Sequence, residues 1–210
     1  HGAHVVMRSR KEGGQGLVEF TLAVPVIILV LVSVAEIGLA LGNNHTIGYG
    51  SREGARVGSA LANGDAVDCS DPDPAGVDKT LVAAVQRILK SPGSGLDISR
   101  VTQIRIFRAT ATGAVDGNAY STWVYVGEGS GAEIDPDAGY IRIDFDRFGP
   151  NPWPACGRVN SGPNPDSIGV TVDYEYEFVT PLPQLVDAIT GGALSFTLSE
   201  TTVMSLNPSV

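Results

Sequence analysis

The chain has 210 residues and a formal net charge of −9, which allows one folded domain together with a membrane anchor. Its acidic balance, with arginines scattered along the chain, argues against nucleic acid as a partner, because phosphate binding needs clustered basic charge. The segment before Gly13 is instead basic, with Arg8, Arg10 and Lys11 against one Glu12. By the positive-inside tendency, this leader stays in the cytoplasm and the acidic remainder is exported.

An apolar run follows the leader, from Phe20 to Leu41, and Glu36 is its single interior carboxylate. Roughly 20 such residues can cross a bilayer core of about 30 Å as a helix. A second carboxylate, Glu19, stands at the start of the run, five residues after Gly14, where a charge is costly unless it is paired. Glu36 falls near the outer interface, and two roles stay open for it: a carboxylate that reaches surface water, or a paired group inside a filament.

The order of these features is a basic leader, a glycine, four residues, Glu-Phe and an apolar helix, and it resembles the class III prepilin signal of type IV pili. An ordinary secretory signal has its small-residue cleavage site after the apolar core. Further along, residues 51–56 read SREGAR and resemble the R-E-G-A-R segment of TadE-like proteins, the minor pilins of the tight-adherence (Tad) pilus. Residues 168–178, with TPL at 180–182, and residues 194–204 are similar to the two closing strands of that family.

The resemblance implies a minor pilin, which is a structural and interaction protein and not an enzyme. A prepilin peptidase, itself a membrane protein, would cut after Gly14 and expose the amine of Gln15. Glu19 would occupy the fifth mature position, where the family's glutamate is thought to pair with a free N-terminus, and with Phe20 it would serve assembly. The subunit would first sit in the inner membrane as a single-pass protein with a cytoplasmic N-terminus. An inner-membrane assembly platform would then pass it into an extracellular pilus, where its helix packs against other pilin subunits and the pilus supports surface adhesion.

Two other classes of protein are also compatible with this sequence. One is a permanently membrane-anchored extracytoplasmic binding domain that never enters a filament, for which cleavage after Gly14 is unnecessary. The other is a membrane-tethered hydrolase, which would need convergent acidic residues.

The membrane helix is expected over residues 15–41, after a leader at residues 1–14, and to continue over residues 42–62. Small residues recur there at every fourth position, and this spacing lets another backbone approach closely, as between membrane helices. Because the stripe wraps around the helix, several neighbours in a bundle could use it. The alternative is that the glycines end the helix near residue 42. The stripe consists of Gly38, Gly42, Thr46, Gly50, Gly54, Gly58 and Ala62.

The exported domain is expected over residues 63–210. A turn-rich break at 63–76 precedes an amphipathic helix at 77–90, and alternating apolar residues then predict strands at 101–109, 121–126, 140–145 and 168–178. A short helical piece at 182–189 precedes the last strand at 194–206. The fold class is therefore α+β and pilin-like, with a long N-terminal helix packed on an antiparallel sheet of about five strands.

Two cysteines, Cys69 and Cys156, lie in the exported part and outside any metal-ligand spacing. A structural disulfide is the leading interpretation in an oxidising compartment, and two unpaired thiols are the alternative. Histidines are absent after His45, which excludes Ser-His-Asp and Cys-His catalysis and histidine metal sites from the domain.

Several carboxylates lie close together in the sequence. Asp144 and Asp146 form one set on a strand face, and Asp173, Glu175 and Glu177 form another. Adjacent solvent-facing acids explain these sets better than a catalytic pair across a cleft. We therefore expect no enzyme activity.

No cofactor is expected either. Calcium is the one candidate ion, because acidic turns at 135–139 and 68–73 offer oxygen ligands. Neither turn matches an EF-hand loop, and ordinary turn chemistry explains both.

Overall fold

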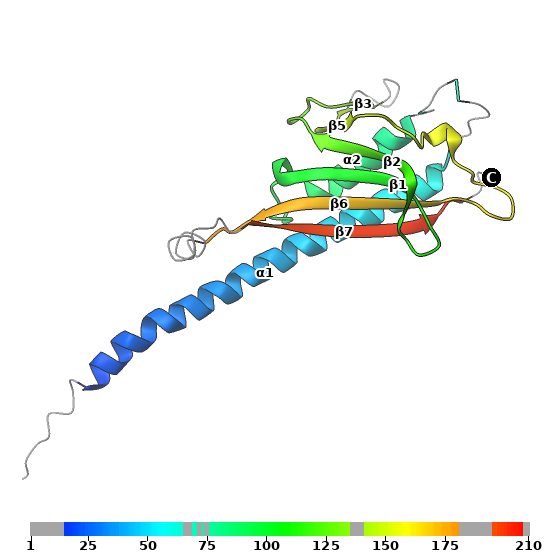
Figure 1. Cartoon of the computed structure of the whole chain (residues 1–210). Coiled ribbons are helices and arrows are strands. Elements are labelled where there is room, and N and C mark those ends of the chain that lie inside the picture. Colours follow the sequence, from blue (N-terminus) through cyan, green and yellow to red (C-terminus); the bar gives the residue numbers. More distant parts are fainter. Residues whose placement is uncertain are drawn as a thin grey trace, which may run out of the picture.

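The computed structural model of the chain describes residues 15–64, 69–70, 73, 76–134, 141–180 and 195–207. A single helix, α1 (Gln15–Leu61), projects from a body in which a five-stranded antiparallel sheet is covered on one face by the outer half of α1 and by α2 (Val77–Leu89) (Figure 1). The expected α+β fold class is confirmed. The leader, the acidic turn at 135–139 and the helical piece expected at 182–189 lie outside the described residues.

The sheet has the order β5-β2-β1-β6-β7, and every neighbouring pair is antiparallel. The longest pairing joins β6 and β7 over eleven residues each without a register shift. Predicted and observed bounds of β1, β6 and β7 agree within a residue or two. The strands are β1 (Val101–Ala109), β2 (Val115–Tyr125), β5 (Phe145–Phe148), β6 (Ser167–Glu177) and β7 (Ser195–Ser205).

The prediction of one strand at 140–145 is wrong, because the structure has two short strands there. β4 (Ile141–Arg142) pairs with β3 (Glu133–Ile134) in a separate two-stranded sheet, and β5 starts only at Phe145 and pairs with β2. The chain bends between them at Asp144, which is buried. A buried carboxylate needs polar partners, and those of Asp144 come from outside a strand ladder: the N–H of Gly129 at 2.9 Å and the ammonium of Lys90 at 3.0 Å.

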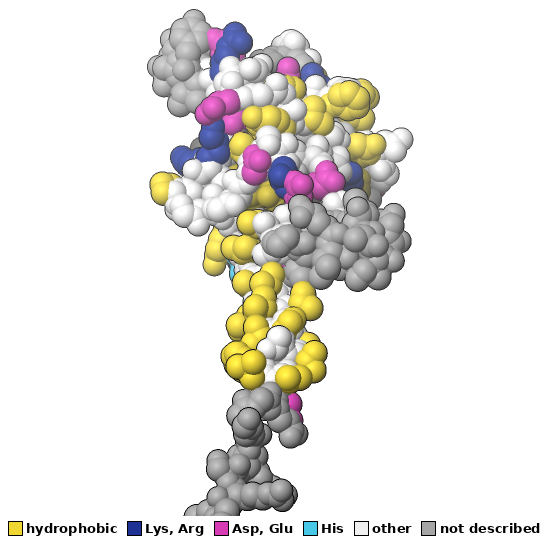
Figure 2. All heavy atoms as spheres, turned by 90° about the vertical axis from the view of Figure 1, so that its left-hand side faces the viewer, with side chains coloured by type: hydrophobic (Ala, Val, Ile, Leu, Met, Phe, Trp, Pro, Cys, Tyr) yellow, Lys and Arg dark blue, Asp and Glu magenta, His cyan; other side chains and the backbone are white. Residues whose placement is uncertain are grey.

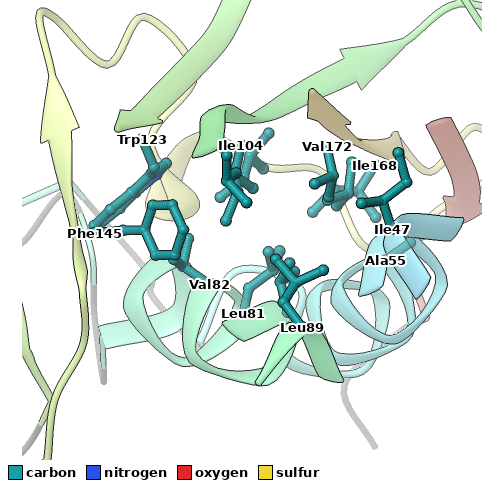
Figure 3. Close-up of a cluster of buried hydrophobic side chains, with 14 of the residues drawn as sticks. Ile47, Ala55, Leu81, Val82, Leu89, Ile104, Trp123, Phe145, Ile168 and Val172 are labelled. Atoms are coloured by element: carbon teal, nitrogen blue, oxygen red, sulfur yellow. The ribbon is translucent and has the colours of Figure 1, made fainter. Parts of the chain in front are cut away.

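The core lies between the inner face of the sheet and the two helices (Figure 3). Alternate residues of β6 point into it, because successive side chains of a strand face opposite ways. Full burial of such an aliphatic side chain contributes about 1.5–3 kcal/mol as an upper estimate. The core members that meet across this layer include Ile168, Val170 and Val172 of β6, Leu81, Val85 and Leu89 of α2, and Ile47 and Ala55 of α1.

Three glycines of the small-residue stripe fit α2 against α1. A Cβ added at Gly50 would lie 3.1 Å from Leu89, and one at Gly54 would lie 2.6 Å from Val85. At Gly58 the added Cβ would be 2.6 Å from Leu81. The helix therefore continues past residue 42, as favoured from the sequence, and this half of the stripe packs within the subunit and not against neighbours. A Cβ at Gly38 or Gly42 meets nothing within 4 Å.

A disulfide joins Cys69 and Cys156, the pair expected from the sequence, with their Cα atoms 5.2 Å apart. It ties the segment after α1 to a short 3-10 helix, η4 (Ala155–Gly157). The bridge closes a loop with a sequence separation of 87. In the chain-entropy view, closing so long a loop stabilises the folded state by about 4 kcal/mol.

Candidate functional site

The inner half of α1 stands clear of the body, and Figure 2 shows a largely apolar surface on the side of the helix that faces the viewer. The exposed apolar side chains follow one another along the helix, so they surround it. From Gly16 to Ala35, every side chain is exposed or partly exposed, and Leu22 retains 72 % of its accessible surface. A helix that is hydrophobic all round requires an apolar environment, which is a membrane or other helices. By length and composition, α1 could span a membrane.

The predicted processing and assembly residues lie at the inner end of this helix. Gln15 is the first helical residue, and Glu19 and Phe20 are exposed about one turn later. Residues four apart lie on the same helix face, about 6 Å apart along the axis. The structure thus brings Gln15 and Glu19 to one face. Gly14 lies outside the described residues, and the roles of all four residues stay predictions.

Glu36 has neither role that was considered from the sequence, because it is only 3 % exposed and its partners belong to its own subunit. One carboxylate oxygen accepts a hydrogen bond from the Tyr176 hydroxyl at 2.7 Å and another from the Val179 N–H at 2.8 Å. The other oxygen accepts from the Thr180 N–H at 3.1 Å. Burial, together with the adjacent carboxylate, raises the pKa of Tyr176, so the phenol keeps its proton and donates it.

Glu36 therefore fixes α1 to the end of β6, at the level where the exposed half of the helix meets the body. The donors are about 140 residues away in the sequence, so no local pattern indicates them.

Further outward, β7 is bonded to α1 at three levels along the helix. The bonds join side chains spaced seven or eight residues apart on α1, which is about two helical turns and therefore one face. They are Asn44 Nδ2 to Glu200 at 2.7 Å, the hydroxyls of Ser51 and Thr202 at 2.9 Å, and the Ser59 hydroxyl to the carbonyl of Ser205. The outer half of α1 is thus part of the domain and does not stand apart from it.

The SREGAR segment (residues 51–56) contains both buried small residues and charged residues at the surface. Gly54 and Ala55 are fully buried against α2 and the sheet. Glu53 is hydrogen-bonded to Arg56 at 2.7 Å on its own helix and lies 3.4 Å from Arg87 on α2. The small residues let the two helices approach, and the glutamate links them at the rim of the contact.

A buried ion pair near the disulfide could not be anticipated from the sequence. The guanidinium of Arg158 donates to Asp78 on α2, and both side chains are almost fully buried. The guanidinium also lies over the ring of Trp153, 4.6 Å from its centroid, and donates to the carbonyl of Ala62 at 3.4 Å. All of these partners are structural, so the pair holds the end of α1, the start of α2 and the disulfide loop together.

The two carboxylate sets lie in different surroundings. Asp173, Glu175 and Glu177 share the outer face of β6, as the alternation predicts. Asp144 and Asp146 do not share a face, because Asp144 is buried against Lys90 and Asp146 is exposed. In the ranges that the structure describes, no three His, Cys, Asp or Glu side chains gather closely enough to hold a metal ion.

Residues 14–56 match the family model described as TadE-like protein. The chain carries a TadE-like N-terminal segment. The match begins at Gly14, takes in Glu19 and ends at Arg56, so it covers the exposed half of α1 and the SREGAR segment, and the expected family resemblance is confirmed there. This match suggests a Tad pilus-associated protein. No curated protein and no solved structure matches the chain significantly.

Proposed function

We propose that the chain is a minor pilin subunit of a Tad-type pilus, assembled through the inner half of α1 and supporting surface adhesion. One observation carries the proposal: the TadE-like match falls on a helix whose inner half is left uncovered by its own domain, whereas its outer half is fixed to that domain. Such a subunit can transfer its exposed half from lipid to neighbouring helices without any change in the body.

In this proposal the apolar half of α1 first holds the subunit in the inner membrane, with the basic leader in the cytoplasm. A prepilin peptidase cuts after Gly14, and the assembly platform then moves the helix among other pilin subunits. The new ammonium of Gln15 pairs with Glu19 of a neighbour. An ammonium and a carboxylate each lose hydration in a helical core, and each offsets the other's desolvation cost. The disulfide between Cys69 and Cys156 supports an exported body, because such bonds persist in oxidising compartments.

The cleavage step tests the proposal against a permanent membrane anchor. We expect Gly14→Ala to slow or abolish processing by a coexpressed prepilin peptidase, because the added methyl group enlarges the residue next to the scissile bond, where the smallest residue is needed. Mass spectrometry of the recovered chain gives the readout, with Gly13→Ala as the neighbouring control. A wild-type chain that keeps residues 7–14 in the presence of the peptidase would favour the anchored binding domain.

The assembly role of Glu19 is tested by Glu19→Gln, which keeps the size of the side chain and removes its charge. Membrane insertion and cleavage should persist, since neutralising a carboxylate makes insertion easier. Incorporation into sheared pili should fall, because the ammonium of a neighbour would lose its partner in a desolvated core. Glu175→Gln, at an exposed position on β6, is the matched control. Normal incorporation of the Glu19 variant would remove Glu19 from the assembly mechanism.

A further inference from the structure

The outer face of the sheet, which is the face turned away from α1 and α2 and toward the viewer in Figure 1, carries a groove of about 530 Å³. Arg105 on β1 pairs in register with Thr122 on β2, and Thr122 pairs with Phe148 on β5, so three adjacent strands bring their side chains to the same face. The principal lining residues are Gln103, Arg105, Asn118, Tyr120, Thr122 and Phe148.

Arg105 places a guanidinium without an ion-pair partner among the described residues at the lining of this groove. Its guanidinium lies over the ring of Tyr120, 5.5 Å from the centroid. Its Nε is buried without a hydrogen-bond partner, and within the described ranges the guanidinium forms no ion pair. Asp173, the acid on the neighbouring strand, accepts hydrogen bonds from Gln103 at 2.6 Å and from Ser199. A stacked guanidinium of this kind is oriented for a planar, bidentate anion such as a carboxylate.

The groove also exposes two aromatic rings. Tyr120 retains 38 % of its accessible surface and Phe148 retains 70 %. Tyr120 pairs with Phe107, which is only 2 % exposed although it too lies on the outer face. The Phe107 ring fills the space above Gly169, where an added Cβ would lie 2.2 Å from it. The exposed rings of Tyr120 and Phe148 therefore offer apolar surface beside the packed ring of Phe107.

The polar and apolar parts of the groove together point to one class of ligand. A pyranose ring has an apolar C–H face and a polar edge of hydroxyl groups, so its face can lie on the exposed ring of Phe148. The amides of Gln103 and Asn118 can meet the hydroxyls, and a carboxylate on the sugar can meet Arg105. We propose that this groove binds sugars that carry a carboxylate group. The inference extends the adhesion part of the proposed function, although the binding itself needs no filament.

Binding is tested on the full chain in nanodiscs of zwitterionic lipid, by saturation-transfer NMR and titration. The probes are methyl glucuronide and N-acetylneuraminic acid, with methyl glucoside as the neutral match and acetate as the carboxylate alone. We expect at least one carboxylated sugar to bind, with methyl glucoside and acetate weaker by about tenfold or more, the size of one lost charge-assisted contact. Arg105→Lys and Phe148→Ala should each weaken binding to a similar degree.

The chain offers a matched control, because Arg52 is also stacked on a tyrosine, 5.8 Å from the ring centroid of Tyr49, outside the groove. Arg52→Lys should leave binding unchanged. Equal binding of glucoside and glucuronide, no binding of either carboxylated sugar, or unaltered binding by Arg105→Lys would overturn the inference. A chain that keeps its leader should bind like the processed chain, so failure of the pilin proposal and failure of this one are separable.

Discussion

The close approach of α1 and α2 at Gly54 gives a quantitative prediction for domain stability. In Gly54→Ala the new Cβ would lie 2.6 Å from Cγ2 of Val85 and 3.2 Å from Val170. Val85 is β-branched and held in one rotamer on a helix, so the helices must separate slightly. Overpacking of this kind costs about 1–3 kcal/mol. The gain in helix propensity returns up to about 1 kcal/mol, which leaves a net loss of up to about 3 kcal/mol.

Gly48→Ala is the matched control on the same helix, because its added Cβ would meet only Glu200, at an ordinary 3.7 Å. This variant should be as stable as the wild type or up to about 1 kcal/mol more stable. Val85→Ala alone should cost about 2 kcal/mol for the buried groups it removes. In the double variant Gly54→Ala/Val85→Ala, the new methyl group occupies the vacated space. The loss of stability in the double variant should therefore be smaller than the sum of the two single-variant losses, by about 1–2 kcal/mol.

The assay is denaturant unfolding of the oxidised, full-length chain in micelles, followed by tryptophan fluorescence. Both tryptophans, Trp123 and Trp153, are buried in the body, so the signal reports on the domain and not on the membrane half of α1. The reasoning would be refuted if Gly54→Ala matched Gly48→Ala in stability, or if the double-variant cycle gave no coupling. Either result would mean that the two helices adjust their spacing without cost.

Two further predictions concern buried charge. Arg158→Met should destabilise the domain by about 3–5 kcal/mol in the same unfolding assay, because it leaves the carboxylate of Asp78 buried without its cation. The double variant Arg158→Met/Asp78→Leu should recover much of this loss. Hydrogen bonding to Asp144 raises the pKa of Lys90, so its stabilising contribution is complete below the ordinary lysine pKa and is lost as the pH rises through the folded value. Lys90→Met should therefore lower the free energy of unfolding by about 1–2 kcal/mol at pH 7, after allowance for a side chain that is 37 % exposed. The difference in stability from the wild type should narrow at strongly alkaline pH, and a constant difference would contradict the stabilising role of the Lys90–Asp144 pair.

The sequence predicts the elements whose pattern is local. The bounds of β1, β6 and α2 follow from alternation and helical periodicity, because in each element one face is buried and the other is wet. The strand predicted at 140–145 fails for a related reason: its residues alternate regularly, but the aspartate that should face water at residue 144 is bonded to Lys90, 54 residues earlier. Alternation does not reveal which polar residue has such a distant partner.

The candidate site likewise has features that the sequence predicts and features that it does not. The spacing of Gly14, Glu19 and the apolar run is contiguous, so the family resemblance and the exposed helix could be anticipated. The burial of Glu36 could not be anticipated, because its hydrogen-bond donors, Tyr176 and Val179, lie about 140 residues later in the sequence. The groove on the outer face also depends on strand register, since Arg105, Thr122 and Phe148 become neighbours only when β1, β2 and β5 pair.

The bonds between α1 and the last two strands determine how the subunit would carry mechanical force. The polypeptide direction of β7 is the same as that of α1, since Glu200 lies beside Asn44 and Ser205 lies beside Ser59. Tension applied along α1 would therefore load its links to β7 sideways and together, as in a lap joint. The attachment of Glu36 to the end of β6 lies nearest the exposed half of the helix and adds three hydrogen bonds to these links. A pull on the helix is thereby shared by the sheet over about 23 residues of α1, roughly 35 Å at 1.5 Å per residue.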